Sequence, residues 1–96
     1  MSFAEQLRYD QRLVILRILK ELPQYRANSS VLCMALEKFG HTISRDAVKT
    51  ELAWLAEQHL ITLEDIGPVL VATLKERGGD VAEGRAVVPG VRRPGA

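Results

Sequence analysis

Two amphipathic segments joined by a very short connection limit the fold of this chain more than any other feature of its sequence. The first, 30–39, is followed by Gly40, which suits the position just after a helix. The second, 45–58, follows Ser44, a favourable N-cap residue. Only 41–43 lie between Gly40 and this cap. Two helices joined by so short a turn form a helix-turn-helix unit.

Further elements are predicted on both sides of this unit. Apolar residues at helical spacing predict a long helix over 3–22, which Pro23 ends because it cannot donate a backbone hydrogen bond. The runs 60–63 and 69–74 are rich in β-branched and aliphatic residues, and together they predict a two-stranded hairpin. A short last helix is expected over 75–83.

The expected order of three helices, a hairpin and a short helix is the winged helix-turn-helix arrangement, mainly α with a small β-hairpin. We place this domain at 1–84. The segment 24–29 is expected to be a loop between the first two helices. Beyond Gly84 the chain is rich in glycine, proline, valine and arginine, so 85–96 is predicted to be a basic, flexible C-terminal tail.

The sequence also resembles a known family. The stretch SRDAVKTELAWLAEQHLITLED resembles the third helix and first wing strand of bacterial winged-helix regulators, whose leucine pattern is matched by Leu52, Leu55, Leu60 and Ile61. The segment VATLKERGGDVAEG resembles their exit from the wing into the last helix. From MSFAEQLRYDQRLVILRIL to VVPGVRRP, the chain is similar to small proteins of Mu-like transposable phages and prophages, which are described as ArsR-like by fold. The resemblance implies a phage or prophage protein and brings no catalytic motif with it.

Several functional classes are excluded by composition. No apolar run approaches the ~20 residues of a membrane helix, and no secretory signal is evident, so we expect a cytoplasmic protein without membrane contact. The single cysteine, Cys33, cannot supply a thiolate cluster, so the ArsR-like resemblance does not imply metal sensing, and no metal or cofactor is expected. Cys33 lies among apolar residues and is predicted to be inert, and His41 is predicted to lie at the surface or to cap a helix. We predict no catalytic residue and no enzyme activity.

The net charge of +1 conceals an uneven distribution. Residues 1–26 carry five basic and three acidic side chains, 27–84 carry five basic and nine acidic, and 85–96 carry three arginines and no acid. Lysine and arginine supply most of the affinity for DNA phosphates. The acidic middle, including a wing tip at 64–68 with two acids and no cation, therefore argues against DNA binding, whereas the basic ends favour it.

The second helix of such a unit normally enters the major groove of DNA. With its apolar stripe turned inward, 45–58 presents Arg45 and Lys49 toward base edges or phosphates, and nearby hydroxyl groups can donate to phosphates. We therefore predict a transcriptional regulator that binds double-stranded DNA. The alternative is a winged-helix module that binds a phage or host protein and no DNA. The predicted DNA contacts are Arg26, Thr42, Ser44, Arg45, Lys49 and Thr50.

A second, narrower apolar stripe lies on the far side of the first helix, with Tyr9, Leu13 and Leu16 at helical spacing. Either the C-terminal segment covers this stripe, or the stripe forms a dimer contact. Trp54 likewise either packs within the domain or anchors a partner. We expect a homodimer, and its predicted contacts are Tyr9, Leu13, Leu16 and Trp54.

Overall fold

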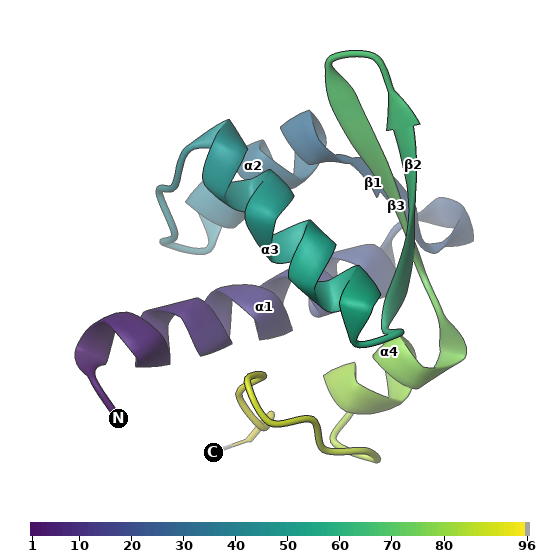
Figure 1. Ribbon diagram of the computed structural model, residues 1–96. Coiled ribbons are helices and arrows are strands. Elements are labelled where there is room, and N and C mark those ends of the chain that lie inside the picture. Colours follow the sequence, from purple (N-terminus) through teal and green to yellow (C-terminus); the bar gives the residue numbers. More distant parts are fainter. Residues whose placement is uncertain (96) are drawn as a thin grey trace.

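A computed structural model describes residues 1–95 of the chain (Figure 1). The wing is the hairpin formed by β2 (Ile61–Ile66) and β3 (Val69–Leu74). The elements are α1 (Phe3–Glu21), the short 3-10 helix η1 (Pro23–Tyr25), β1 (Arg26–Asn28), α2 (Ser29–Lys38), α3 (Arg45–Glu57), β2 (Ile61–Ile66), β3 (Val69–Leu74) and α4 (Glu76–Ala82). This order confirms the predicted fold class, a mainly helical winged helix-turn-helix with a small antiparallel sheet.

α1 and α3 begin where the sequence predicts, because side-chain oxygens cap their free backbone N–H groups. Ser2 and Glu5 form a capping box at the start of α1, in which the Glu5 N–H donates to Ser2 Oγ and the Ser2 N–H donates to Glu5 Oε1. Ser44 Oγ accepts the Ala47 N–H at the start of α3. Each of these helices therefore has its first turn fixed locally.

The sheet has three strands, in the order β1-β3-β2, and all pairs are antiparallel. The expectation of a loop over 24–29 is wrong for its second half, because Arg26–Asn28 pairs with the free edge of β3, with Ala27 opposite Ala72. Left-handed backbone at Gln24 and Tyr25 turns the chain from α1 into this strand. The strand β2 also runs further than predicted, so that the hairpin turns only at Gly67-Pro68.

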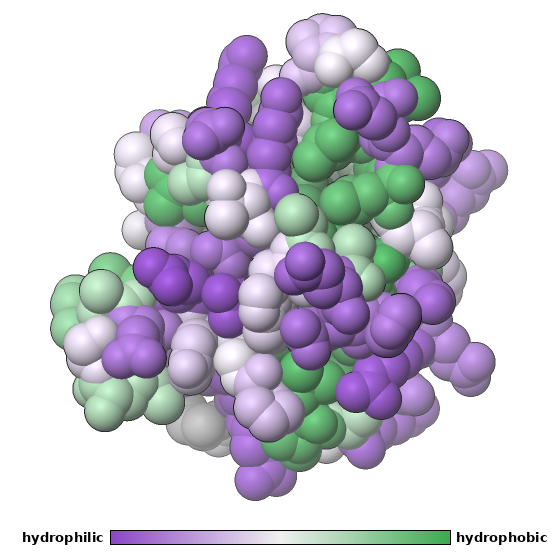
Figure 2. Space-filling model, viewed as in Figure 1, coloured by the Kyte–Doolittle hydropathy of each residue, from purple (hydrophilic) through white to green (hydrophobic). Residues whose placement is uncertain are grey.

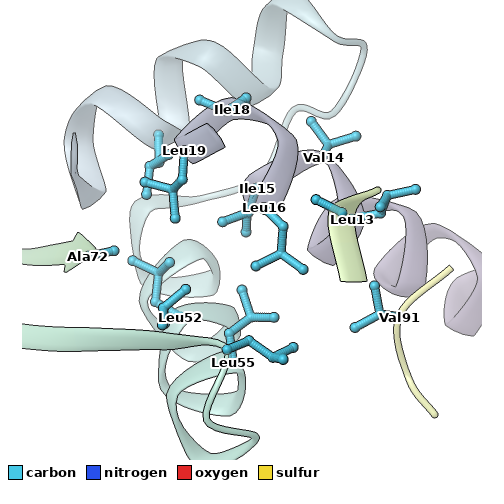
Figure 3. Close-up of a cluster of buried hydrophobic side chains, with 14 of the residues drawn as sticks. Leu13, Val14, Ile15, Leu16, Ile18, Leu19, Leu52, Leu55, Ala72 and Val91 are labelled. Atoms are coloured by element: carbon cyan, nitrogen blue, oxygen red, sulfur yellow. The ribbon is translucent and has the colours of Figure 1, made fainter. Parts of the chain in front are cut away.

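The core lies between α1, α2, α3 and the sheet, and α1 runs through its middle (Figure 3). Its largest fully buried apolar side chains are Leu13, Ile15, Leu16, Leu19, Leu32, Leu36, Val48, Leu52, Leu55, Leu60 and Ile61. α4 packs on the same core through a close approach at Gly78, where a Cβ atom would clash with the Leu60 carbonyl oxygen. The glycine that weakens α4 intrinsically is therefore needed for this packing.

The C-terminal segment, residues 85–95, packs against α1 instead of forming the predicted flexible tail. Val88 and Val91 are 3% and 7% exposed and belong to the main hydrophobic core. The Arg92 N–H donates to the Tyr9 carbonyl oxygen, which joins the segment to the first half of α1. The prediction failed because the two buried valines stand among glycines and prolines, whose abundance is typical of mobile chain.

The same packing corrects the predicted dimer contact on α1. Leu13 is 1% exposed and Leu16 is fully buried within a single copy of the chain. Figure 3 shows Val91 on the side of the core where Leu13 lies. Of the two interpretations of this stripe, coverage by the C-terminal segment is therefore the one observed, and the apolar surface that suggested a dimer contact there does not exist.

Candidate nucleic-acid interface

The start of α3 presents a polar surface, because its apolar side points into the core. Val48, Leu52 and Leu55 are buried, while Arg45 and Thr50 are exposed. The Arg45 side chain makes no hydrogen bond or ion pair within residues 1–95. The start of α3 and the tip of the wing lie toward the same end of the molecule, away from α4 and the C-terminal segment (Figure 1). One face thus combines the two elements that a winged helix can place on DNA.

The hydroxyl groups predicted as DNA contacts have local roles in this structure. Thr42 is exposed in the turn before α3. Ser44 Oγ accepts the capping hydrogen bond and keeps its own proton for another acceptor. Thr50 Oγ1 donates to the Asp46 carbonyl oxygen one turn earlier in α3. The structure therefore gathers Thr42, Ser44 and Arg45 at the beginning of the helix, whereas Thr50 lies further along it.

Lys49 connects α3 to the wing. Its Nζ donates to the Pro68 carbonyl oxygen at the hairpin turn, at 2.8 Å. Two of the three ammonium hydrogens remain for other acceptors. Sequence reasoning did not reveal this contact, because Pro68 is brought next to Lys49 only by the tertiary packing of the wing.

Arg26 lies on the sheet and not in a loop before α2. Its Nη2 contacts Glu64 Oε1 at 3.0 Å, and Arg26 pairs with Thr73 of β3. The wing therefore has a cation beside one of its two acids, which the sequence alone did not show. Both side chains are about half exposed, so this ion pair adds little stability and can be exchanged for another partner.

A buried ionic cluster supports α3 from behind. Arg12 Nε and Glu51 Oε1 are 2.6 Å apart, both side chains are buried, and Arg8 lies 3.8 Å from the other carboxylate oxygen of Glu51. The Arg12 guanidinium also lies 3.8 Å from the centre of the Trp54 ring and donates to the Gly90 carbonyl oxygen. The contacts of Trp54 therefore support the interpretation in which it packs within the domain.

A second cluster fixes the turn before α3. His41 Nε2 lies 2.7 Å from Asp10 Oδ2, and Arg92 Nη1 donates to Asp10 Oδ1 at 2.9 Å. Burial raises the pKa of Asp10, but the hydrogen bonds from His41 and Arg92 outweigh it and hold this pKa below its ordinary value. His41 is buried, so its predicted surface or capping position is wrong. No local signal could have shown this, since Asp10 is 31 positions away.

Tyr9, the remaining predicted dimer contact, is half-buried beneath the C-terminal segment. Cys33 is also half-buried, and its Sγ donates to the Ile43 carbonyl oxygen. Among residues 1–95, no group of three metal-ligating side chains comes together. No helix in the described part of the chain is both long and apolar enough to span a membrane.

Comparison with known proteins finds relatives in a phage and in a bacterium. The chain is 52% identical over 85 residues to the uncharacterized protein gp26 of Escherichia phage Mu, an alignment that covers 88% of each chain. It is 47% identical over 78 residues to an uncharacterized protein of Haemophilus influenzae, which covers 80% of this chain and 76% of that one. No protein-family model matches the sequence.

Among solved structures, the chain is similar to a mutant of Lactococcus lactis ZitR in its apo form. The TM-score is 0.57 at 24% sequence identity, and the match covers 86% of this chain and 58% of that chain. At this identity the likeness concerns the fold alone. This chain therefore corresponds to somewhat more than half of the ZitR chain.

Proposed function

This chain belongs to the family of the phage Mu protein gp26, and from the geometry of its winged helix we propose that it is a regulator that binds double-stranded DNA with the start of α3 in the major groove. The observation that carries the proposal is the exposed, unpaired Arg45 at the beginning of a helix whose opposite side is fully packed. The major groove admits an α-helix, and an arginine can donate two parallel hydrogen bonds to a guanine.

Phosphate contacts would come from groups around Arg45. Thr42 and Ser44 lie beside the N-terminus of α3, where free N–H groups and the helix dipole favour an anion. Lys49 is held at the wing turn with two ammonium hydrogens to spare, and Arg26 can leave Glu64 for a phosphate. Asp46, in the first turn of α3, can accept a hydrogen bond from cytosine. These groups supply both positioning and base contacts.

Salt titration of binding to a random-sequence duplex tests the proposal. Each phosphate contact contributes a slope of about −0.9 to the dependence of log K on log salt. We expect Arg45→Ala to weaken binding and to reduce the slope by about one such unit. The matched control is Arg77→Ala, which removes the same charge from an exposed position on α4, at the far end of the molecule (Figure 1).

Two outcomes would contradict the proposal. The first is no binding to any duplex at low salt. The second is equal loss of affinity in Arg45→Ala and Arg77→Ala, which would mean that only overall charge matters.

A protein-binding function is the second candidate, and one observation favours it. The wing carries Glu64 and Asp65, and Asp65 has no ion-pair partner within residues 1–95. An acidic wing repels DNA phosphates but suits a basic protein surface. Absence of DNA binding in the titration above, together with capture of a phage or host protein that Asp65→Lys abolishes, would favour this candidate.

A further inference from the structure

One side of α1 carries four apolar residues, which share it with Asp10, Arg17 and Glu21. Phe3, Leu7, Val14 and Ile18 recur at spacings that keep them on the same side, since 11 residues make about three turns of an α-helix. We call these four residues the α1 stripe. Phe3 is 74% exposed and Leu7 is partly exposed, whereas Val14 and Ile18 are sunk below the surface. The stripe therefore protrudes at its N-terminal end and is recessed at its C-terminal end.

Two hollows open along this stripe. The first, of about 560 Å³, lies beside the second half of α1, with Val14, Ile18 and Leu22 on one wall and Phe39 of the adjoining turn on another. Phe39 is exposed although it is a large aromatic residue. The second hollow, of about 740 Å³, lies between the first half of α1 and residues 87–93. Figure 2 shows apolar surface gathered where the N-terminal end of α1 projects from the molecule.

We propose that this side of α1 binds a second copy of the chain, with the two α1 helices antiparallel about a two-fold axis near residue 12. Phe3 of each copy would then enter the hollow beside Ile18 and Phe39 of the other. Glu21 lies at the edge of that hollow. Phe3 and Glu21 lie equally far from residue 12, on opposite sides of it along the chain. An antiparallel pair therefore brings the protruding Phe3 of each copy opposite the recess of the other copy. Such self-complementarity is a property of two-fold interfaces.

The charges along the stripe fit the same arrangement. Arg17 and Glu21 are exposed and make no ion pair within residues 1–95. In the antiparallel pair, Glu21 of one copy faces the exposed Arg93 beside the N-terminal hollow of the other. Opposite charges thus meet at both ends, which favours a second copy over an unrelated partner.

No residue of α3 lines either hollow, so the test of this interface is separate from the test of DNA binding. It also differs from the dimer contact predicted from the sequence, since it uses none of Leu13, Leu16 and Trp54, although Tyr9 lines its N-terminal hollow.

Sedimentation equilibrium over a wide concentration range tests the proposal. We expect the wild-type protein to form dimers and Phe3→Glu to raise the dimer dissociation constant at least tenfold. The matched control is Ile66→Glu, which places the same charge at an exposed apolar residue of the wing and should dimerise like the wild type. Thermal unfolding confirms that both variants fold, and Leu7→Glu supplies a second disruptive substitution.

Charge reversal tests the antiparallel orientation. Glu21→Arg and Arg93→Glu should each weaken the dimer, and the two together should restore it in part. A wild-type protein that remains monomeric at the highest concentration would overturn the proposal, as would a Phe3→Glu variant that dimerises like Ile66→Glu. Failure of the double charge reversal to restore pairing would overturn the antiparallel arrangement.

Discussion

The charged groups behind α3 and those in front of it are arranged in opposite ways. Behind the helix, Arg12 and Glu51 are buried in a short ion pair, with Trp54 stacked on the guanidinium. In front, Arg45 has no partner within residues 1–95, and Arg26 meets Glu64 in a half-exposed pair. Buried charges must keep their partners, whereas exposed charges can exchange them for a ligand. The difference indicates that the rear cluster holds α3 in place and the front surface is free to bind.

The largest expected effect comes from breaking the rear pair. Glu51→Ala leaves Arg12 buried without its carboxylate, which should lower the free energy of unfolding by about 3–5 kcal/mol. Glu64→Ala removes the same kind of partner from an exposed arginine and should cost less than about 1 kcal/mol. Urea denaturation of both variants measures the contrast. Equal losses would mean that burial does not distinguish the two pairs.

A smaller effect is expected from the C-terminal segment, which carries the backbone acceptor for Arg12. Val88→Ala removes buried methyl groups and should lower the free energy of unfolding by about 2 kcal/mol. The adjacent Val87 is exposed, so Val87→Ala should leave stability unchanged within about 0.5 kcal/mol. If the segment were mobile in solution, both alanine variants would unfold at the same urea concentration as the wild type.

The pH dependence of stability tests the cluster around the turn before α3. The pKa of Asp10 is lowered in the folded protein, so this carboxylate stabilises the fold above the ordinary aspartate pKa of about 3.9. The contribution is lost as the pH falls through the lower folded-state value. We expect Asp10→Asn to be less stable than the wild type at neutral pH, and this gap to close in acid. A gap that stays constant from pH 7 to pH 2 would exclude the assigned role of Asp10.

The smallest expected effect concerns the front surface. Glu64→Gln removes a negative charge from the wing and releases Arg26, so DNA affinity at low salt should rise by about two- to fivefold. Glu76→Gln on α4 is the matched control and should change affinity less. Equal rises in both variants would show that the wing does not approach DNA.

Local signals were sufficient to predict the helices and the hairpin. Pro23, Gly40 and Ser44 act on their own neighbours in the chain, so the ends of α1, α2 and the start of α3 followed from sequence. Strand β1 could not be predicted in this way. Its three residues have no pattern of their own and become a strand only because the edge of β3 is open to them.

The candidate site was predictable only in its exposed part. Thr42, Ser44 and Arg45 come together because they are adjacent in sequence. The groups that hold them are far apart along the chain: Arg12 and Glu51 are separated by 39 positions, and Asp10 and His41 by 31. Nothing in the local sequence around such residues shows that their charges will be buried and paired.

We propose that the start of α3 binds DNA while the α1 stripe does not. Titration of ¹⁵N-labelled protein with a random duplex at low salt, followed by amide chemical shifts, tests it most directly. We expect the shift changes to concentrate in residues 42–50 and at the wing turn, and residues 3–9 and 87–93 to change little. Changes confined to the two ends of the chain, or no changes at all, would contradict it.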